Sequence, residues 1–76
     1  TQLERRVLDV WRETLQLEQL DLHDDFFLAG GDSLRAMALA AKLESALGRP
    51  VAPTLLWQAR TAAAMAAELT DPAPND

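Results

Sequence analysis

Apolar residues recur at helical spacing in the first part of the chain. Four of them stand four positions apart, with charged residues largely on the other faces: Leu3, Val7, Trp11 and Leu15. This period places apolar side chains on one face of an α-helix, so we predict a helix from Gln2 to about Leu17. Trp11 is the largest side chain on that face and is expected in the core. Thr1 is a candidate N-cap, and Glu4 adds a weak capping-box signal.

A second helical pattern begins at Ser33. Its apolar positions are three and four residues apart and form an inward stripe: Ala36, Leu39, Ala40, Leu43 and Leu47. Gly48 follows where a left-handed C-terminal cap is expected, and Pro50 and Pro53 prevent the helix from continuing. The pattern therefore predicts a helix from Ser33 to Leu47.

The rest of the chain is predicted to contain one short and one longer helix. Residues 54–58 suffice for a single turn, and Thr61 is a candidate N-cap for an alanine-rich helix that ends near Leu69. Together the patterns predict an all-α fold, a small four-helix bundle with three main helices, one short helix and no convincing strand. We expect the domain to occupy residues 1–70 and residues 71–76, with two prolines, to be a linker or tail.

The connection between the first two helices, residues 18–32, has no clean period. Fifteen residues are many for a compact domain, and such loops are usually functional or packed by their own side chains. Phe26 and Phe27 are the expected anchors, because two phenylalanines exposed to water cost free energy. Adjacent side chains rarely point the same way, so one of the two should be buried more deeply.

The composition narrows the class of function. The chain has 76 residues, no cysteine, and 12 acidic against 7 basic residues, which gives a net charge of −5. Such a domain repels phosphate backbones, so we expect no nucleic-acid partner. No stretch reaches the roughly 18 apolar residues of a membrane span, and we expect a cytoplasmic location. The acidity favours solubility, or it steers basic partners towards four residues near Ser33: Asp21, Asp24, Asp25 and Asp32.

Ser33 follows a glycine pair at the start of a helix, and this position allows several interpretations. Serine and aspartate are favoured N-caps, so Ser33 can be an ordinary cap. Nucleophilic catalysis needs a nearby base, and His23 is the only histidine; it forms no metal-ligand pattern either. We therefore expect no catalytic residue and no metal ligand. A modified serine stays open, because a helix N-terminus favours a phosphate ester and two glycines leave space for an enzyme.

The motif Asp25-Phe26-Phe27 followed by Gly30-Gly31-Asp32-Ser33-Leu34 closely resembles the attachment site of peptidyl carrier (thiolation) domains of nonribosomal peptide synthetases. The resemblance extends over nearly the whole chain, through matched positions that include Val10, Trp11, Leu15, Ala36, Met37, Leu39, Leu56, Trp57, Ala59 and Thr61. Ala29 and Arg60 depart from it, where the family usually has leucine and proline. The first departure concerns the packing of the loop under Ser33, and the second is expected to affect only the start of the last helix.

The resemblance implies a four-helix fold of the acyl-carrier type with no catalysis of its own. A phosphopantetheinyl transferase would move 4′-phosphopantetheine from coenzyme A onto Ser33, with Gly31, Asp32 and Leu34 as the flanking motif. The thiol of this arm would hold an aminoacyl, peptidyl or aryl group as a thioester. Adenylation, condensation, epimerisation or thioesterase domains of a synthetase would then be the partners of a monomeric carrier.

The resemblance also places a docking surface just after the serine. We predict that Met37, with Leu34 and Leu55, forms this surface; Leu34 is equally well explained as a core residue. Arg35 and Arg60 are expected to be solvated charges. The alternatives are an acyl carrier domain of a polyketide or fatty-acid system, which the paired phenylalanines and glycines disfavour, and an unmodified helical adaptor whose Ser33 is only a cap.

Overall fold

The computed structural model describes residues 1–69, so Thr70 and the predicted linker at 71–76 lie outside the described residues. Within them the chain forms four helices: α1 (Gln2–Leu15), α2 (Ser33–Leu47), α3 (Leu55–Gln58) and α4 (Ala62–Leu69). Residues 1–69 contain no strand, only an isolated antiparallel bridge between Asp25 and Thr61. This confirms the predicted all-α bundle of three main helices and one short one. None of these helices has the length and apolar character needed to cross a bilayer.

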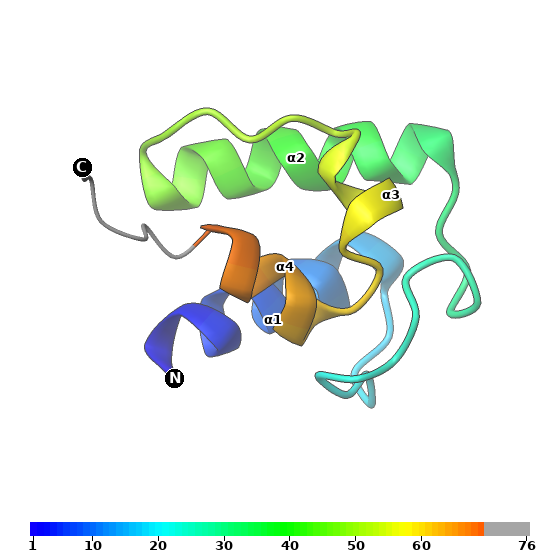
Figure 1. Cartoon of the computed structure of the whole chain (residues 1–76). Helices are drawn as coiled ribbons and strands as arrows, with labels where there is room; N and C mark the ends of the chain where they lie inside the picture. Colours follow the sequence, from blue (N-terminus) through cyan, green and yellow to red (C-terminus); the bar gives the residue numbers. More distant parts are fainter. Residues whose placement is uncertain (70–76) are drawn as a thin grey trace.

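The four helices make a two-sided arrangement (Figure 1). Helix α2 lies along one side, α1 and α4 lie together on the other, and the short α3 stands between α2 and α4 near the start of α2. Helix α1 contacts both α2 and α4. The long loop occupies the end of the molecule at which α2 begins, so the residues before Ser33 are held at one pole of the bundle.

Local capping explains where α1 begins and ends. The Thr1 hydroxyl accepts a hydrogen bond from the Glu4 backbone N–H, and a full capping box is present, stronger than the sequence signal suggested. The helix ends at Leu15, two residues earlier than predicted, because Gln16 takes the left-handed conformation with φ 58°. Leu17 consequently lies outside the helix and is partly exposed.

The later helix boundaries follow the predicted signals. Gly48 has φ 70° and closes α2 with a bond from its N–H to the Glu44 carbonyl. The Thr61 hydroxyl accepts from the Ala64 N–H at 3.1 Å, which makes Thr61 the cap of α4. Two alanines of α4 are completely buried or nearly so, Ala62 and Ala66, and their small side chains allow α4 to pack closely on the core.

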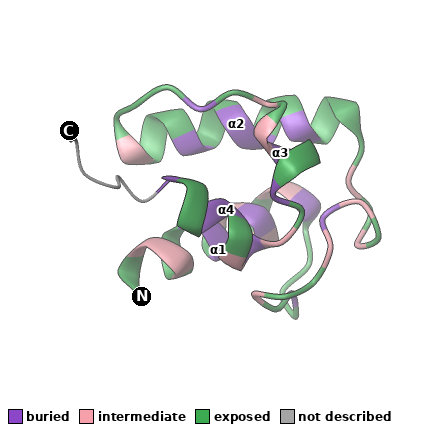
Figure 2. Cartoon of the chain, in the orientation of Figure 1, coloured by how far each residue is buried: buried purple, intermediate pink, exposed green. Residues whose placement is uncertain are grey.

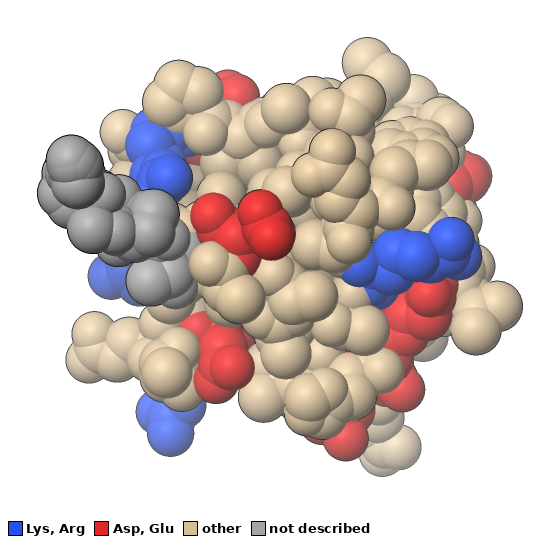
Figure 3. Space-filling view, viewed as in Figure 1, with Lys and Arg blue, Asp and Glu red and all other residues tan. Residues whose placement is uncertain are grey.

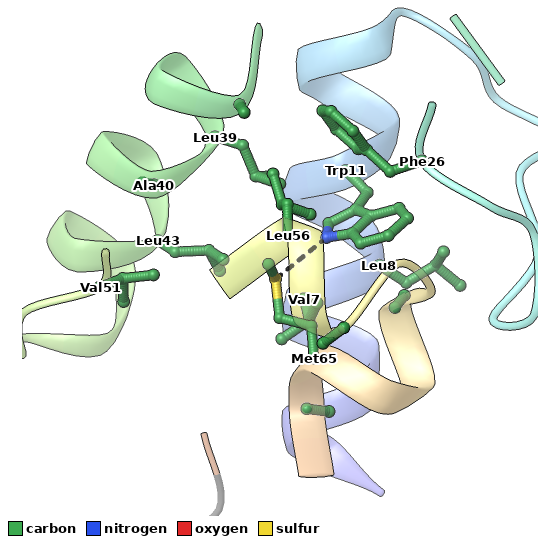
Figure 4. Close-up of a cluster of buried hydrophobic side chains, with 14 of the residues drawn as sticks. Val7, Leu8, Trp11, Phe26, Leu39, Ala40, Leu43, Val51, Leu56 and Met65 are labelled. Atoms are coloured by element: carbon green, nitrogen blue, oxygen red, sulfur yellow. Dashed lines mark hydrogen bonds between the residues drawn. The ribbon is translucent and has the colours of Figure 1, made fainter. Parts of the chain in front are cut away.

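The core is apolar and is centred on Trp11 (Figure 4). The Phe26 ring packs edge-on against the Trp11 indole, with ring centroids 5.1 Å apart. The indole N–H donates to the Met65 sulfur at 3.4 Å, so α1, the loop and α4 meet at one side chain. Phe26 is completely buried whereas Phe27 is only half-buried, as expected for adjacent side chains. Figure 2 shows the buried positions facing inward between the helices.

Candidate functional site

Ser33 is the first residue of α2, and Asp32, not Ser33, caps the helix. The Asp32 carboxylate accepts a hydrogen bond from the Arg35 backbone N–H at 2.8 Å. Ser33 is exposed, and its hydroxyl has no hydrogen-bond partner within residues 1–69. The interpretation of Ser33 as an ordinary cap is therefore wrong, because an aspartate one position earlier already performs that role. The hydroxyl is left available at the surface.

The glycine pair before Asp32 has two different structural causes. Gly30 has φ 114°, a backbone conformation that residues other than glycine rarely adopt. No atom lies within 4 Å of the place that a Cβ atom of this residue would occupy. Gly31 instead sits directly on the ring of Phe26, where a Cβ atom would collide with three ring carbons. Its N–H donates to the Phe26 carbonyl at 2.9 Å. Gly30 thus allows a positive φ, and Gly31 lets the backbone lie close against the core.

Asp25 organises the other end of this turn. Its Oδ1 accepts from the N–H groups of Phe27 and Leu28 at 2.9 and 3.1 Å. Its Oδ2 accepts from the Arg60 Nε at 2.8 Å, in an ion pair across 35 residues of sequence. The hydrogen bond from Arg60 is the main reason why the pKa of Asp25 is lowered from its ordinary value of 3.8.

Arg60 has a larger role than the sequence predicts. Its guanidinium also lies over the Phe27 ring, 5.0 Å from the centroid, and Phe27 contacts the half-exposed Trp57, with centroids 5.3 Å apart. Arg60 is exposed, as expected, but the expectation that it affects only the start of the last helix is wrong, because Arg60 joins the long loop to the α3–α4 junction. Arg35 is as exposed as Arg60, and its Nη1 lies 3.6 Å from the Asp32 carboxylate.

The aspartates of the loop differ in what they contact. The carboxylates of Asp24 and Asp21 accept hydrogen bonds from backbone N–H groups of the loop itself. Asp24 accepts from the Asp21 N–H at 2.8 Å, and Asp21 accepts from the Leu22 N–H at 2.7 Å. Residues 16–34 contain five carboxylates and no lysine or arginine, so this segment alone carries a charge equal to the net charge of the chain, −5. In Figure 3 acidic and basic atoms adjoin on the right of the view, within a surface that is mostly uncharged.

The surroundings of Ser33 do not form an enclosed site. An open pocket of about 290 Å³ lies between the end of α1 and the loop and is lined by Leu17, Gln19, Leu20, Asp24, Asp25, Leu28 and Ala29. Ser33 does not line it. Residues 1–69 also hold no group of three or more side chains suited to a metal ion. His23 is exposed on the loop.

Two of the three predicted docking residues lie at the surface of α2. Leu34 is 76% exposed and Met37 is 60% exposed. Leu34 is therefore a surface residue and not a core residue. Leu55 is only partly exposed and packs against the core. Sequence reasoning missed the exposed side chain of Leu28, because an irregular loop has no period from which an outward direction can be deduced.

The comparisons with known proteins agree with this geometry. The phosphopantetheine attachment site family matches residues 5–69. Surfactin synthase subunit 3 from Bacillus subtilis is 38% identical over 68 residues, which cover 90% of this chain and 5% of that protein. BlmI, a type-II acyl-carrier-protein from Streptomyces verticillus involved in bleomycin biosynthesis, superposes with a TM-score of 0.83 at 30% identity and covers 88% of this chain and 81% of BlmI.

A second solved structure, the McyG A-PCP complexed with phenylalanyl-adenylate, superposes with a TM-score of 0.84 at 31% identity. That likeness covers 92% of this chain and 11% of the other one. The fold and the site define a carrier domain, and this chain belongs to the phosphopantetheine attachment site family. Members of this family carry 4′-phosphopantetheine covalently. The chain spans only a few per cent of the synthetase in which its surfactin-synthase relative is found.

Proposed function

We propose that Ser33 is the residue that carries the 4′-phosphopantetheine of this domain. The observation that supports this most directly is its exposed hydroxyl, which has no partner among residues 1–69 because Asp32 caps the helix. The backbone N–H groups of Ser33 and Leu34 also lack an acceptor in this part of the chain. Donors at the start of a helix favour an anionic group, so the residues present fit a phosphodiester.

Attachment would be the work of a phosphopantetheinyl transferase. The Ser33 oxygen forms a bond to the phosphorus that bears pantetheine, while the phosphoanhydride bond of coenzyme A breaks. The nucleotide half of coenzyme A leaves with the electron pair, and the hydroxyl proton passes to a base of the transferase. In this proposal the chain contributes the acceptor oxygen, held at the helix start by the Asp32 cap and by Gly31 on Phe26.

The proposed role of the domain is to carry intermediates of nonribosomal peptide synthesis. When bound, the prosthetic group supplies a thiol that holds an aminoacyl, peptidyl or aryl group as a thioester. The chain itself is proposed to be non-catalytic, a monomeric domain of a cytoplasmic synthetase. The relatedness to a surfactin synthase subunit and to an A-PCP supports an adenylation domain as one partner. Condensation, epimerisation and thioesterase domains are further proposed partners.

The test of the attachment residue uses the two serines of the chain, Ser33 and Ser45. We expect incubation with coenzyme A, magnesium and a promiscuous transferase to add the mass of one phosphopantetheine. The gain should disappear in Ser33→Ala and persist in Ser45→Ala, which removes an exposed hydroxyl from the same helix. No gain in the wild type, under conditions that modify a control carrier, would favour the unmodified helical adaptor.

A further inference from the structure

We propose that Arg60 is a positioning residue that holds the loop before Ser33 in the conformation that the modifying enzyme recognises. This inference rests on the proposed function of Ser33 and adds to it a residue 27 positions away in the sequence. Arg60 does not contact Ser33 in the structure. Its effect is transmitted through Asp25, Phe27 and the turn that ends at Gly31.

Arg60 contacts the loop with its side chain and its backbone at once. The Nε donates to the Asp25 Oδ2 at 2.8 Å, and the Nη2 lies 3.4 Å from the Oδ1 of the same carboxylate. The guanidinium covers the Phe27 ring at 5.0 Å. The Arg60 carbonyl accepts from the Phe26 N–H at 2.7 Å. Three consecutive loop residues are therefore held by one residue of the α3–α4 junction.

Asp25 links this contact to the fold of the turn. Its Oδ1 accepts the N–H groups of Phe27 and Leu28, which fixes the first bend of the turn. The carboxylate side chain is 23% exposed, and the Arg60 side chain is 51% exposed. Solvent screens an ion pair of this exposure, so we expect a modest effect rather than loss of the fold.

The turn between Asp25 and Gly31 sets the position of the start of α2. The Phe26 carbonyl accepts from the Gly31 N–H at 2.9 Å, and the Phe26 ring lies directly beneath the Gly31 Cα. Asp32 and Ser33 follow at once. With Phe26 buried against Trp11, a loop held at Asp25 and Phe27 keeps the backbone before Ser33 in one place.

The consequence is a pre-ordered acceptor. If a loop is in the recognised conformation only part of the time, its apparent affinity for the enzyme falls by that fraction, while the rate of the bound complex does not change. Loss of Arg60 should therefore raise the KM for the carrier chain and leave kcat unchanged. If Arg60 merely stabilised the whole domain, its loss would not raise the KM for the carrier chain as long as the domain stays folded.

The experiment compares Arg60→Met with the wild type in the transferase assay on the 76-residue chain. Methionine keeps an apolar stem next to Phe27 and removes the charge. We expect the KM for the carrier to rise about threefold to tenfold, the range expected when one exposed ion pair and one exposed cation–π contact are lost. Arg60→Lys should recover part of the difference, because a lysine can still pair with Asp25.

Arg49→Met is the matched control. The Arg49 guanidinium donates to the Leu69 carbonyl at 2.6 Å. Arg49 directly follows the C-cap of α2, so it lies beyond the end of that helix opposite to Ser33 (Figure 1). This substitution also removes one arginine that joins two segments, but it leaves the loop before Ser33 intact. We expect its KM and kcat to equal those of the wild type, even where its stability is reduced.

Hydrogen exchange supplies a readout without the transferase. The Gly31 amide should exchange about threefold to tenfold faster in Arg60→Met than in the wild type. The exchange rate of the Leu43 amide in the core should change only as far as the free energy of unfolding of the whole domain changes. The proposal is overturned if Arg60→Met leaves both KM and Gly31 exchange unchanged, or if Arg49→Met raises KM equally. A wild type that is never modified at Ser33 would refute the proposed function instead, and the assay separates that result from this one.

Discussion

At the scale of single residues, Gly31 shows how closely the backbone before Ser33 approaches the core. Its N–H bonds to the Phe26 carbonyl while the Phe26 ring fills the space of a Cβ atom. We expect Gly31→Ala to lower the free energy of unfolding by about 1–3 kcal/mol, the usual cost of overpacking. Urea unfolding followed by circular dichroism measures this difference.

A second substitution tests whether the Phe26 ring is the cause. In a Phe26→Leu background the smaller side chain leaves room, so Gly31→Ala should cost less there than in the wild type. Gly30→Ala is a useful contrast, since it meets no neighbour and is strained only by its φ of 114°. Equal costs of Gly31→Ala in both backgrounds would contradict the proposed collision.

The Asp25 carboxyl makes stability depend on pH. Its pKa is lowered in the folded chain, first by the hydrogen bond from Arg60, so the ionised form favours folding. This contribution is complete above the ordinary value of 3.8 and is lost as the pH falls through the lower folded-state pKa. We expect the stability of Asp25→Asn to fall less steeply than that of the wild type between about pH 5 and pH 2. The free energy of unfolding is measured by urea titration at each pH. If it falls equally steeply with pH in the wild type and in Asp25→Asn, the result contradicts a contribution of the ion pair.

At the scale of elements, α2 depends on a cap that comes from outside the helix. The Asp32 carboxylate accepts the Arg35 N–H at 2.8 Å, and the Asp32 carbonyl accepts the Ala36 N–H. We expect Asp32→Ala to destabilise the domain by about 1 kcal/mol, because the cap bond is lost, while Asp32→Asn keeps most of the stability. Thermal unfolding distinguishes the two. A result in which both variants lose the same stability would indicate that the charge rather than the cap matters.

The elements also show what local patterns can and cannot predict. The stripe from Ala36 to Leu47 and the cap at Gly48 were predicted from residues within four positions of each other, and the structure confirms them, with Leu47 only partly buried against the core. The end of α1 was predicted two residues too late, since the apolar spacing of four ends at Leu15 and Gln16 has already left the helix. Periodicity reports the side-chain pattern, but the backbone of one residue decided the boundary.

At the scale of the whole molecule, the exposed apolar surface of α2 is the proposed docking surface for partners. Leu34 and Met37 stand one turn apart beside Ser33, and both are more than half exposed. We expect Met37→Asp to lower kcat/KM for modification about tenfold or more, since a charge in an apolar interface must be desolvated. The helical content should not change, because Met37 lies outside the core.

Ala46→Asp is the matched control for that prediction. Ala46 is also exposed on α2, thirteen residues after Ser33, which is about 20 Å along the helix. The Ala46→Asp variant should be modified at Ser33 at the same rate as the wild type. Equal rates for Met37→Asp and the wild type with every cognate partner would remove Met37 from the docking surface.

The amino-acid sequence by itself determined the helices, the caps at Thr1, Gly48 and Thr61, and the presence of a serine at the start of α2, whereas the structure showed that Asp32 is the cap and that the Ser33 hydroxyl is free. These features depend on neighbours within a turn or two, so they can be deduced from spacing. The tertiary structure alone decided the contact of Arg60 with Asp25, the seat of Gly31 on Phe26 and the exposure of Leu34. The physical reason is distance along the chain: Asp25 and Arg60 are 35 residues apart, and only the packing of the loop on the α3–α4 junction brings them together.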